Sequence, residues 1–141
     1  MEMKAALGLS VLIAVTVATS AEIYGMCQLA KELIKDGVPM KDVPDWLCLA
    51  KAVSQMDTSR TTGPAKDGSY SYGIFQIPSN EWCTKGKQGN KCNVKCEDLV
   101  AGSLLPSVQC SQLIYSQKGF QFWDGWVKSC KDKPLPDIHG C

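Results

Sequence analysis

The sequence has little of what several functional classes require. Its formal net charge at pH 7 is only +1, so it lacks the strongly basic surface with which proteins bind nucleic acid. His139 is its single histidine, which disfavours a metal centre built from imidazoles. Beyond the N-terminal segment, no stretch approaches the roughly 20 apolar residues of a membrane-spanning helix. We therefore expect no nucleic-acid partner, no cofactor and no membrane span.

Residues 1–21 have the pattern of a secretory signal peptide. Lys4 precedes an apolar run over residues 5–18, and three small residues, 19–21, follow it. We expect the mature protein to begin near Glu22. The sequence therefore predicts a secreted, extracellular protein with one domain over residues 22–141, and we expect a monomer.

Eight cysteines follow the predicted signal peptide. An even number of cysteines in a small exported chain indicates a disulfide framework. Cys92 and Cys96 have a spacing that zinc ligands also use, but an oxidising compartment favours pairing over metal binding. The spacing alone leaves many pairings open among the eight residues Cys27, Cys48, Cys83, Cys92, Cys96, Cys110, Cys130 and Cys141.

Apolar periodicity predicts helices toward both ends of the mature chain. Apolar residues from Met26 to Ile34 recur at three-and-four spacing, and Gly37 with Pro39 ends that helix. A second helix begins at Pro44 and carries Val53 on its apolar face. A third has Pro106 in its first turn and ends before Gly119, and a short helical turn carries Trp123 and Trp126.

The middle of the chain has a different pattern. Residues 69–77 alternate and are rich in aromatic and β-branched side chains after an Asp67-Gly68 turn, which predicts a small antiparallel sheet. Residues 84–95 and the tail 133–141 are polar or rich in Gly and Pro, which is typical of loops. We expect an α+β architecture: a mainly helical lobe and a small sheet lobe, with a cleft between them.

Four stretches in this order resemble one known family. They are the Cys92-x-x-x-Cys96 spacing, the segment 72–77 followed by Trp82 and Cys83, the segment 119–130 with its two tryptophans, and the terminal Gly140-Cys141. Together they resemble the c-type lysozymes, glycoside hydrolase family 22, and above all those of insects. The resemblance covers essentially the whole mature chain. It implies the disulfide pairs Cys27–Cys141, Cys48–Cys130, Cys83–Cys96 and Cys92–Cys110.

The resemblance also implies where catalytic groups would lie. Family members cut the β-1,4 chain of peptidoglycan with a glutamic acid, five residues after the second cysteine, and an aspartate just before the Tyr-Gly pair. In this sequence those positions hold Val53 and Ser71, and an asparagine usual after the Gln-Ile pair is Pro78. The resemblance therefore implies a protein without catalytic residues and without glycosidase activity.

Two nearby carboxylates are the alternatives to the missing pair. Asp57 follows Val53 by one helical turn, and Asp67 precedes Ser71 by four residues. One turn displaces a group by about 5 Å, and a displacement of about 1 Å already impairs catalysis. Asp67 is also explained as the turn residue beside Gly68.

Sugar binding is the family function that the sequence still favours. Trp82, Trp123 and Gln76 match substrate-binding residues of the family, although tryptophans also pack in cores, as we expect for Trp126. Glu81 replaces the neighbouring residue of the family's cleft. The loop lysines either meet anionic wall polymers or form a solvated face: Lys85, Lys87, Lys91 and Lys95.

No metal is expected either. The calcium site of the related α-lactalbumins needs several carboxylates between Cys96 and Cys110, but the matching positions are Ala101, Pro106 and Ser107. The resemblance thus predicts a secreted, non-catalytic, lysozyme-like protein that binds peptidoglycan or chitin in antibacterial defence. Two alternatives remain: an active muramidase that uses other groups, and an extracellular scaffold that binds another protein.

Overall fold

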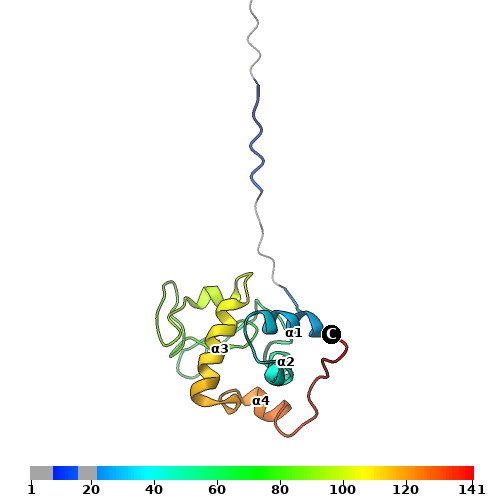
Figure 1. Cartoon of the computed structure of the whole chain (residues 1–141). Helices are drawn as coiled ribbons and strands as arrows, with labels where there is room; N and C mark the ends of the chain where they lie inside the picture. The colour runs from blue at the N-terminus through cyan, green and yellow to red at the C-terminus, as the bar shows by residue number, and fades with distance from the viewer. Residues whose placement is uncertain (1–7, 16–21) are drawn as a thin grey trace, which may run out of the picture.

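The computed structural model describes residues 8–15 and 22–141 (Figure 1). The predicted signal peptide falls largely on residues 1–7 and 16–21, which lie outside the described residues. In chain order the described elements are α1 (Met26–Lys35), η1 (Met40–Asp42), α2 (Val43–Ser54), β1 (Thr61–Thr62), β2 (Ser71–Tyr72), β3 (Ile77–Pro78), η2 (Cys96–Val100), α3 (Leu105–Lys118), η3 (Phe120–Phe122) and α4 (Asp124–Ser129). The predicted α+β architecture is confirmed.

The helix predictions agree with α1, α2 and α3. Helix α1 buries Leu29 and Leu33, and Gly37 follows it with a φ of +95°, a conformation that ends helices readily when the residue is glycine. Helices α2 and α3 each carry their proline in the first turn, where no backbone N–H is needed. Trp123 lies just before α4, so only Trp126 of the predicted pair is within that helix.

The predicted small antiparallel sheet is confirmed. Within residues 69–77, β2 and β3 are antiparallel neighbours, and the chain turns between them at Gly73–Gln76. Gly73 has a φ of +79° and Gln76 one of +50°, so the alternating pattern spans a tight turn instead of an extended segment. Strand β1, which the sequence did not predict, pairs with β2 and completes the order β1-β2-β3.

The core joins the two lobes around Trp46 of α2. Its ring meets Phe75 of the β2–β3 turn edge-on at a centroid distance of 5.4 Å, and Phe120 and Trp123 at 4.9 and 5.8 Å. All four residues are buried. Aromatic pairs in this geometry stabilise a fold by about 0.5–1.5 kcal/mol beyond the area that they bury. The sheet turn is therefore fixed against the helical lobe.

All four disulfides implied by the resemblance are confirmed. Two of them tie distant segments of the helical lobe, so the C-terminus lies beside α1 (Figure 1). The other two hold the loop over residues 84–95, which forms no helix. The pairs are Cys27–Cys141, Cys48–Cys130, Cys83–Cys96 and Cys92–Cys110.

Candidate functional site

Val53 lies in the last turn of α2, where that helix meets α4. It is half-buried and packs against the core. A Cβ atom built on Gly125 of α4 would lie only 2.8 Å from Cγ1 of Val53, so the close approach depends on the absence of a side chain at Gly125. The side chain at this position is a packing group with no proton to donate and no charge.

Ser71 and Pro78 face each other across the sheet. They are Cα partners in the β2–β3 ladder, and Ser71 pairs with Thr62 of β1 on its other side. Both Ser71 and Pro78 are half-buried. Proline has no N–H to donate, and a serine hydroxyl carries no charge at neutral pH. This part of the sheet therefore presents neither a carboxylate nor the amide that would orient one.

Gln76 uses its side-chain amide to hold the sheet turn together. Its Nε2 donates to the carbonyl oxygens of Arg60 and Gly73, each at 2.9 Å, and its Oε1 accepts from Oγ1 of Thr62 at 2.7 Å. An amide group has two N–H donors, and both are engaged. In this structure Gln76 supports the turn, and its role in binding a ligand stays a prediction.

Trp123 is also engaged inside the molecule. Its Nε1 donates to the carbonyl oxygen of Phe75 at 2.8 Å, and only 4% of the residue is exposed. The ring meets Phe122 edge-on at a centroid distance of 5.0 Å. Trp123 thus links the junction of η3 and α4 to the sheet turn, and its ring also meets Trp46 of α2.

Trp82 has a different environment. It is fully buried, yet its Nε1 has no hydrogen-bond partner among the described residues. Phe122 meets one side of the ring edge-on at 5.8 Å, and Nζ of Lys91 lies 5.0 Å from the ring centroid. Lys91 in turn forms an ion pair with Glu81. Lys91 is thus one of the groups that shield the Trp82 ring from solvent, and a role of Trp82 in binding sugar stays a prediction.

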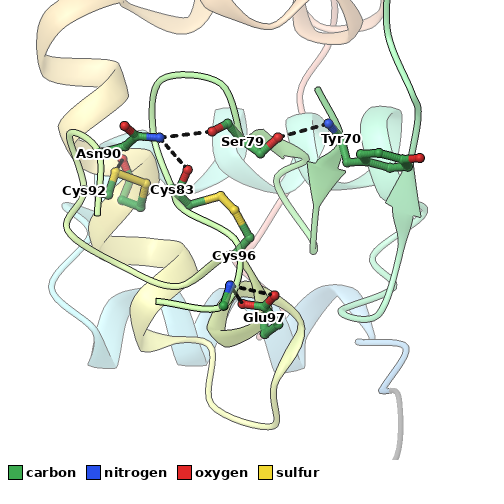
Figure 2. Close-up of a disulfide and its surroundings, with 9 residues drawn as sticks. Tyr70, Ser79, Cys83, Asn90, Cys92, Cys96 and Glu97 are labelled. Atoms are coloured by element: carbon green, nitrogen blue, oxygen red, sulfur yellow. Dashed lines mark hydrogen bonds between the residues drawn. A yellow bond between two sulfur atoms is a disulfide. The ribbon is translucent and has the colours of Figure 1, made fainter. Parts of the chain in front are cut away.

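The loop beyond Trp82 is fixed by polar contacts as well as by disulfides. Asn90 donates from Nδ2 to the carbonyl oxygens of Ser79 and Cys83, at 3.2 and 2.7 Å, beside the Cys83–Cys96 bond (Figure 2). The Glu97 carboxylate accepts from the amide of Gly86 at 3.1 and 3.0 Å. These contacts hold Lys91 in a defined place relative to Trp82.

The two carboxylates considered as replacements, Asp57 and Asp67, each accept hydrogen bonds within their own turn. Asp57 accepts from the amide and hydroxyl of Ser59 at 2.9 and 2.7 Å, and these bonds lower its pKa. Asp67 accepts from the hydroxyl and amide of Ser69 at 2.6 and 2.9 Å, which lowers its pKa in the same way. A general acid in glycoside cleavage needs a raised pKa, so neither environment suits that role.

A hollow of about 680 Å³ lies elsewhere and shares no residue with this site. It is bounded by α1, η1 and the C-terminal tail, and Met40 and His139 are among its lining residues. The predicted cleft between the lobes therefore stays a prediction. Within residues 8–15 and 22–141, three or more metal-ligating side chains nowhere gather, and no helix is long and apolar enough to cross a membrane.

The sequence comparison decides the family. A model of the C-type lysozyme/alpha-lactalbumin family matches residues 22–141. The chain belongs to this family. The resemblance stated from the motifs is thereby confirmed at the level of the family.

The similarity extends to individual lysozymes of insects. Lysozyme c-1 of Anopheles gambiae is 36% identical over 130 residues, which cover 92% of each chain. A lysozyme of Bombyx mori is 37% identical over 131 residues, 92% of this chain and 94% of that protein. Lysozyme P of Drosophila melanogaster is 38% identical over 144 residues and 99% of both chains.

The main feature that sequence reasoning missed in this lysozyme-family fold is the pair Glu81 and Lys91. The two residues were noted separately, one as a changed neighbour of Trp82 and the other as a loop lysine. Their contact depends on how the loop over residues 84–95 returns, which follows from two disulfides and the Asn90 hydrogen bonds. Opposite charges ten residues apart were the only signal in the sequence, and such pairs are common by chance.

Proposed function

We propose that this protein is a secreted member of the lysozyme family that binds amino-sugar polymers, peptidoglycan or chitin, without hydrolysing them. The observation that carries the proposal is the chemistry of two positions, Val53 at the end of α2 and Ser71 in β2. Neither side chain ionises near neutral pH. Secretion is proposed from the residues of the predicted signal peptide and from the four disulfides, which form in oxidising compartments.

Hydrolysis of a glycoside needs a protonated acid at the leaving oxygen and a negative charge facing the sugar. A positioned general acid alone contributes about 10²- to 10⁴-fold to the rate, and the opposed carboxylate adds electrostatic stabilisation. The lowered pKa of Asp57 and that of Asp67 argue against their replacing the acid. The alternative of an active muramidase with other groups is therefore disfavoured.

Binding is supported by the environment of two aromatic residues, Trp82 and Tyr70. Trp82 keeps an indole N–H without an acceptor, and a buried unpaired donor destabilises a fold by about 1–3 kcal/mol. A ligand oxygen that reached this N–H would relieve the penalty. The ring of Tyr70 is likewise approached by a lysine, because Nζ of Lys85 lies 5.7 Å from its centroid.

Two assays test the proposal. In a pull-down with insoluble peptidoglycan and with chitin, we expect the purified mature protein to sediment with at least one polymer, and cellulose serves as the control. In a turbidity assay, we expect no clearing of bacterial walls above a heat-inactivated sample. Clearing would contradict the non-catalytic part, and failure to sediment with either polymer would favour the scaffold that binds another protein.

A further inference from the structure

The Lys91 side chain, which covers the indole ring of Trp82, is held in place by backbone hydrogen bonds as well as by its ion pair with Glu81. The amide of Lys91 donates to the carbonyl oxygen of Glu81, and the amide of Cys92 donates to that of Trp82, both at 3.0 Å. Residues 81–82 and 91–92 therefore run side by side. Their side chains follow from this register: Lys91 lies over the indole ring and contacts the Glu81 carboxylate.

The ion pair between Lys91 and Glu81 is partly exposed, so Lys91 can move away from the Trp82 ring. The Lys91 and Glu81 side chains are 44% and 43% exposed. Exposed ion pairs, and a cation above an aromatic ring at such a site, each stabilise a structure only weakly. A ligand with favourable contacts to Trp82 therefore displaces Lys91 at a moderate free-energy cost.

The charge of the ligand determines the net free-energy cost of displacing Lys91 from Glu81. The hydrogen bond from Lys91, and after it the charges of Lys91 and Lys118, lower the pKa of Glu81, so Glu81 is ionised at neutral pH. A neutral sugar separates Lys91 from Glu81 and gives Lys91 no new partner. A ligand with its own carboxylate gives Lys91 a replacement, while the charge of Lys118 still favours the ionised form of Glu81.

We propose that Lys91 makes this site select carboxylate-bearing amino-sugar chains over neutral ones, by exchanging Glu81 for a carboxylate of the ligand. The proposal rests on the sugar binding proposed above and names the substrate class. Peptidoglycan strands freed of their stem peptides carry a free lactyl carboxylate on every second sugar, whereas chitin has the same linkage and no acidic group. Glu81 acts as the internal competitor that keeps Lys91 in position when no ligand is bound.

The test compares two tetrasaccharides that differ only in their lactyl groups. One is chitotetraose, and the other is the alternating N-acetylglucosamine and N-acetylmuramic acid tetrasaccharide with free carboxylates. Calorimetry gives the affinity of each, and the indole N–H signal of Trp82 in ¹H–¹⁵N spectra reports whether the ligand reaches this residue. We expect the unaltered protein to bind the acidic chain about fivefold more tightly.

Three variants identify the residue responsible. Lys91→Met keeps an apolar cover of similar length and should bring the affinity ratio close to one. Glu81→Gln removes the competitor and should strengthen binding of the neutral chain while the acidic chain stays preferred. Lys87→Met removes the same charge from the same loop, at an exposed lysine that forms no ion pair within the described chain, and should leave the ratio unchanged.

The outcomes separate this inference from the proposed function. If neither tetrasaccharide binds the unaltered protein, the proposed sugar binding is wrong and the inference with it. If both bind equally, or if Lys91→Met keeps the preference, only the role of Lys91 is wrong. An equal loss of preference in Lys87→Met and Lys91→Met would show a general effect of the basic loop and would also contradict the inference. Folding of each variant is checked by its dispersed spectrum.

Discussion

Gly73 joins the sheet lobe to the helical lobe through a contact that no other residue can make. Its φ is +79°, and a Cβ atom at this position would lie 2.1 Å from the carbonyl oxygen of Leu99 in η2 and 3.5 Å from Oγ of Ser107 in α3. Carbon atoms pack at about 3.5–4.0 Å, so a side chain here requires the backbone of one lobe to move. Gly68 has a similar φ of +82° with no atom within 4 Å of the corresponding Cβ.

The two glycines therefore separate backbone strain from steric overlap. An alanine in the left-handed conformation destabilises a fold by about 1–2 kcal/mol, which is the whole effect expected for Gly68→Ala. Gly73→Ala adds the overlap with Leu99, and forced shifts of this kind contribute about 1–3 kcal/mol or more. We expect Gly73→Ala to lower the free energy of unfolding by about 4 kcal/mol and Gly68→Ala by about 1 kcal/mol.

Urea unfolding at pH 7 with the disulfides intact measures both values. The slope with denaturant should match the unaltered protein, so that a change in midpoint reports stability alone. Equal losses for the two variants would refute the close approach of Gly73 to η2. A loss below about 1.5 kcal/mol for Gly73→Ala would refute it as well, because ordinary surface changes already reach about 0.5 kcal/mol.

Two further predictions concern Trp123 and Asp67. Trp123→Phe should lower the free energy of unfolding in urea by about 2 kcal/mol because the buried carbonyl of Phe75 loses its donor; an unchanged midpoint would contradict this. The Ser69 hydroxyl and amide lower the pKa of Asp67 in the fold, so its contribution is present above about pH 3.9 and is lost as the pH falls through the folded pKa. Asp67→Asn should therefore show a smaller acid-induced drop in thermal midpoint, and an equal drop would be the contrary result.

The helices could be predicted because their signals are local. The apolar stripe from Met26 to Ile34, the stop at Gly37 and the proline in the first turn of α2 act within one or two turns of chain. The disulfide pairing could not be chosen from spacing and came from the family resemblance, which the structure confirms.

The sheet turn and the site depend on contacts between distant segments. Alternation over residues 69–77 predicted a small antiparallel sheet but not where its strands end. Gly73 approaches Leu99 and the Gln76 amide binds Arg60 and Thr62, so the chain turns between β2 and β3. The contact of Lys91 with the Trp82 ring was equally hidden, because the disulfide-held loop brings Lys91 to the ring. Periodicity reports which side of a segment is apolar and carries no information about such tertiary neighbours.

The central claim is that the protein has no glycosidase activity. Variants that restore the two carboxylates at positions 53 and 71 are the control for this claim. Val53→Glu with Ser71→Asp returns two carboxylates, and the half-buried position of residue 53 against the core should raise the pKa of the new glutamic acid. Pro78→Asn adds a donor opposite residue 71 in the β2–β3 register. Each single carboxylate variant should remain nearly inactive, because both roles are needed.

The most direct measurement is the clearing of a suspension of bacterial cell walls by the unaltered protein, the double variant and the triple variant, with heat-inactivated protein as the blank. We predict no clearing by the unaltered protein, measurable clearing by Val53→Glu with Ser71→Asp, and faster clearing when Pro78→Asn is added. Clearing by the unaltered protein well above the blank would contradict the non-catalytic function. No clearing by a folded triple variant would contradict the claim that inactivity is confined to Val53, Ser71 and Pro78.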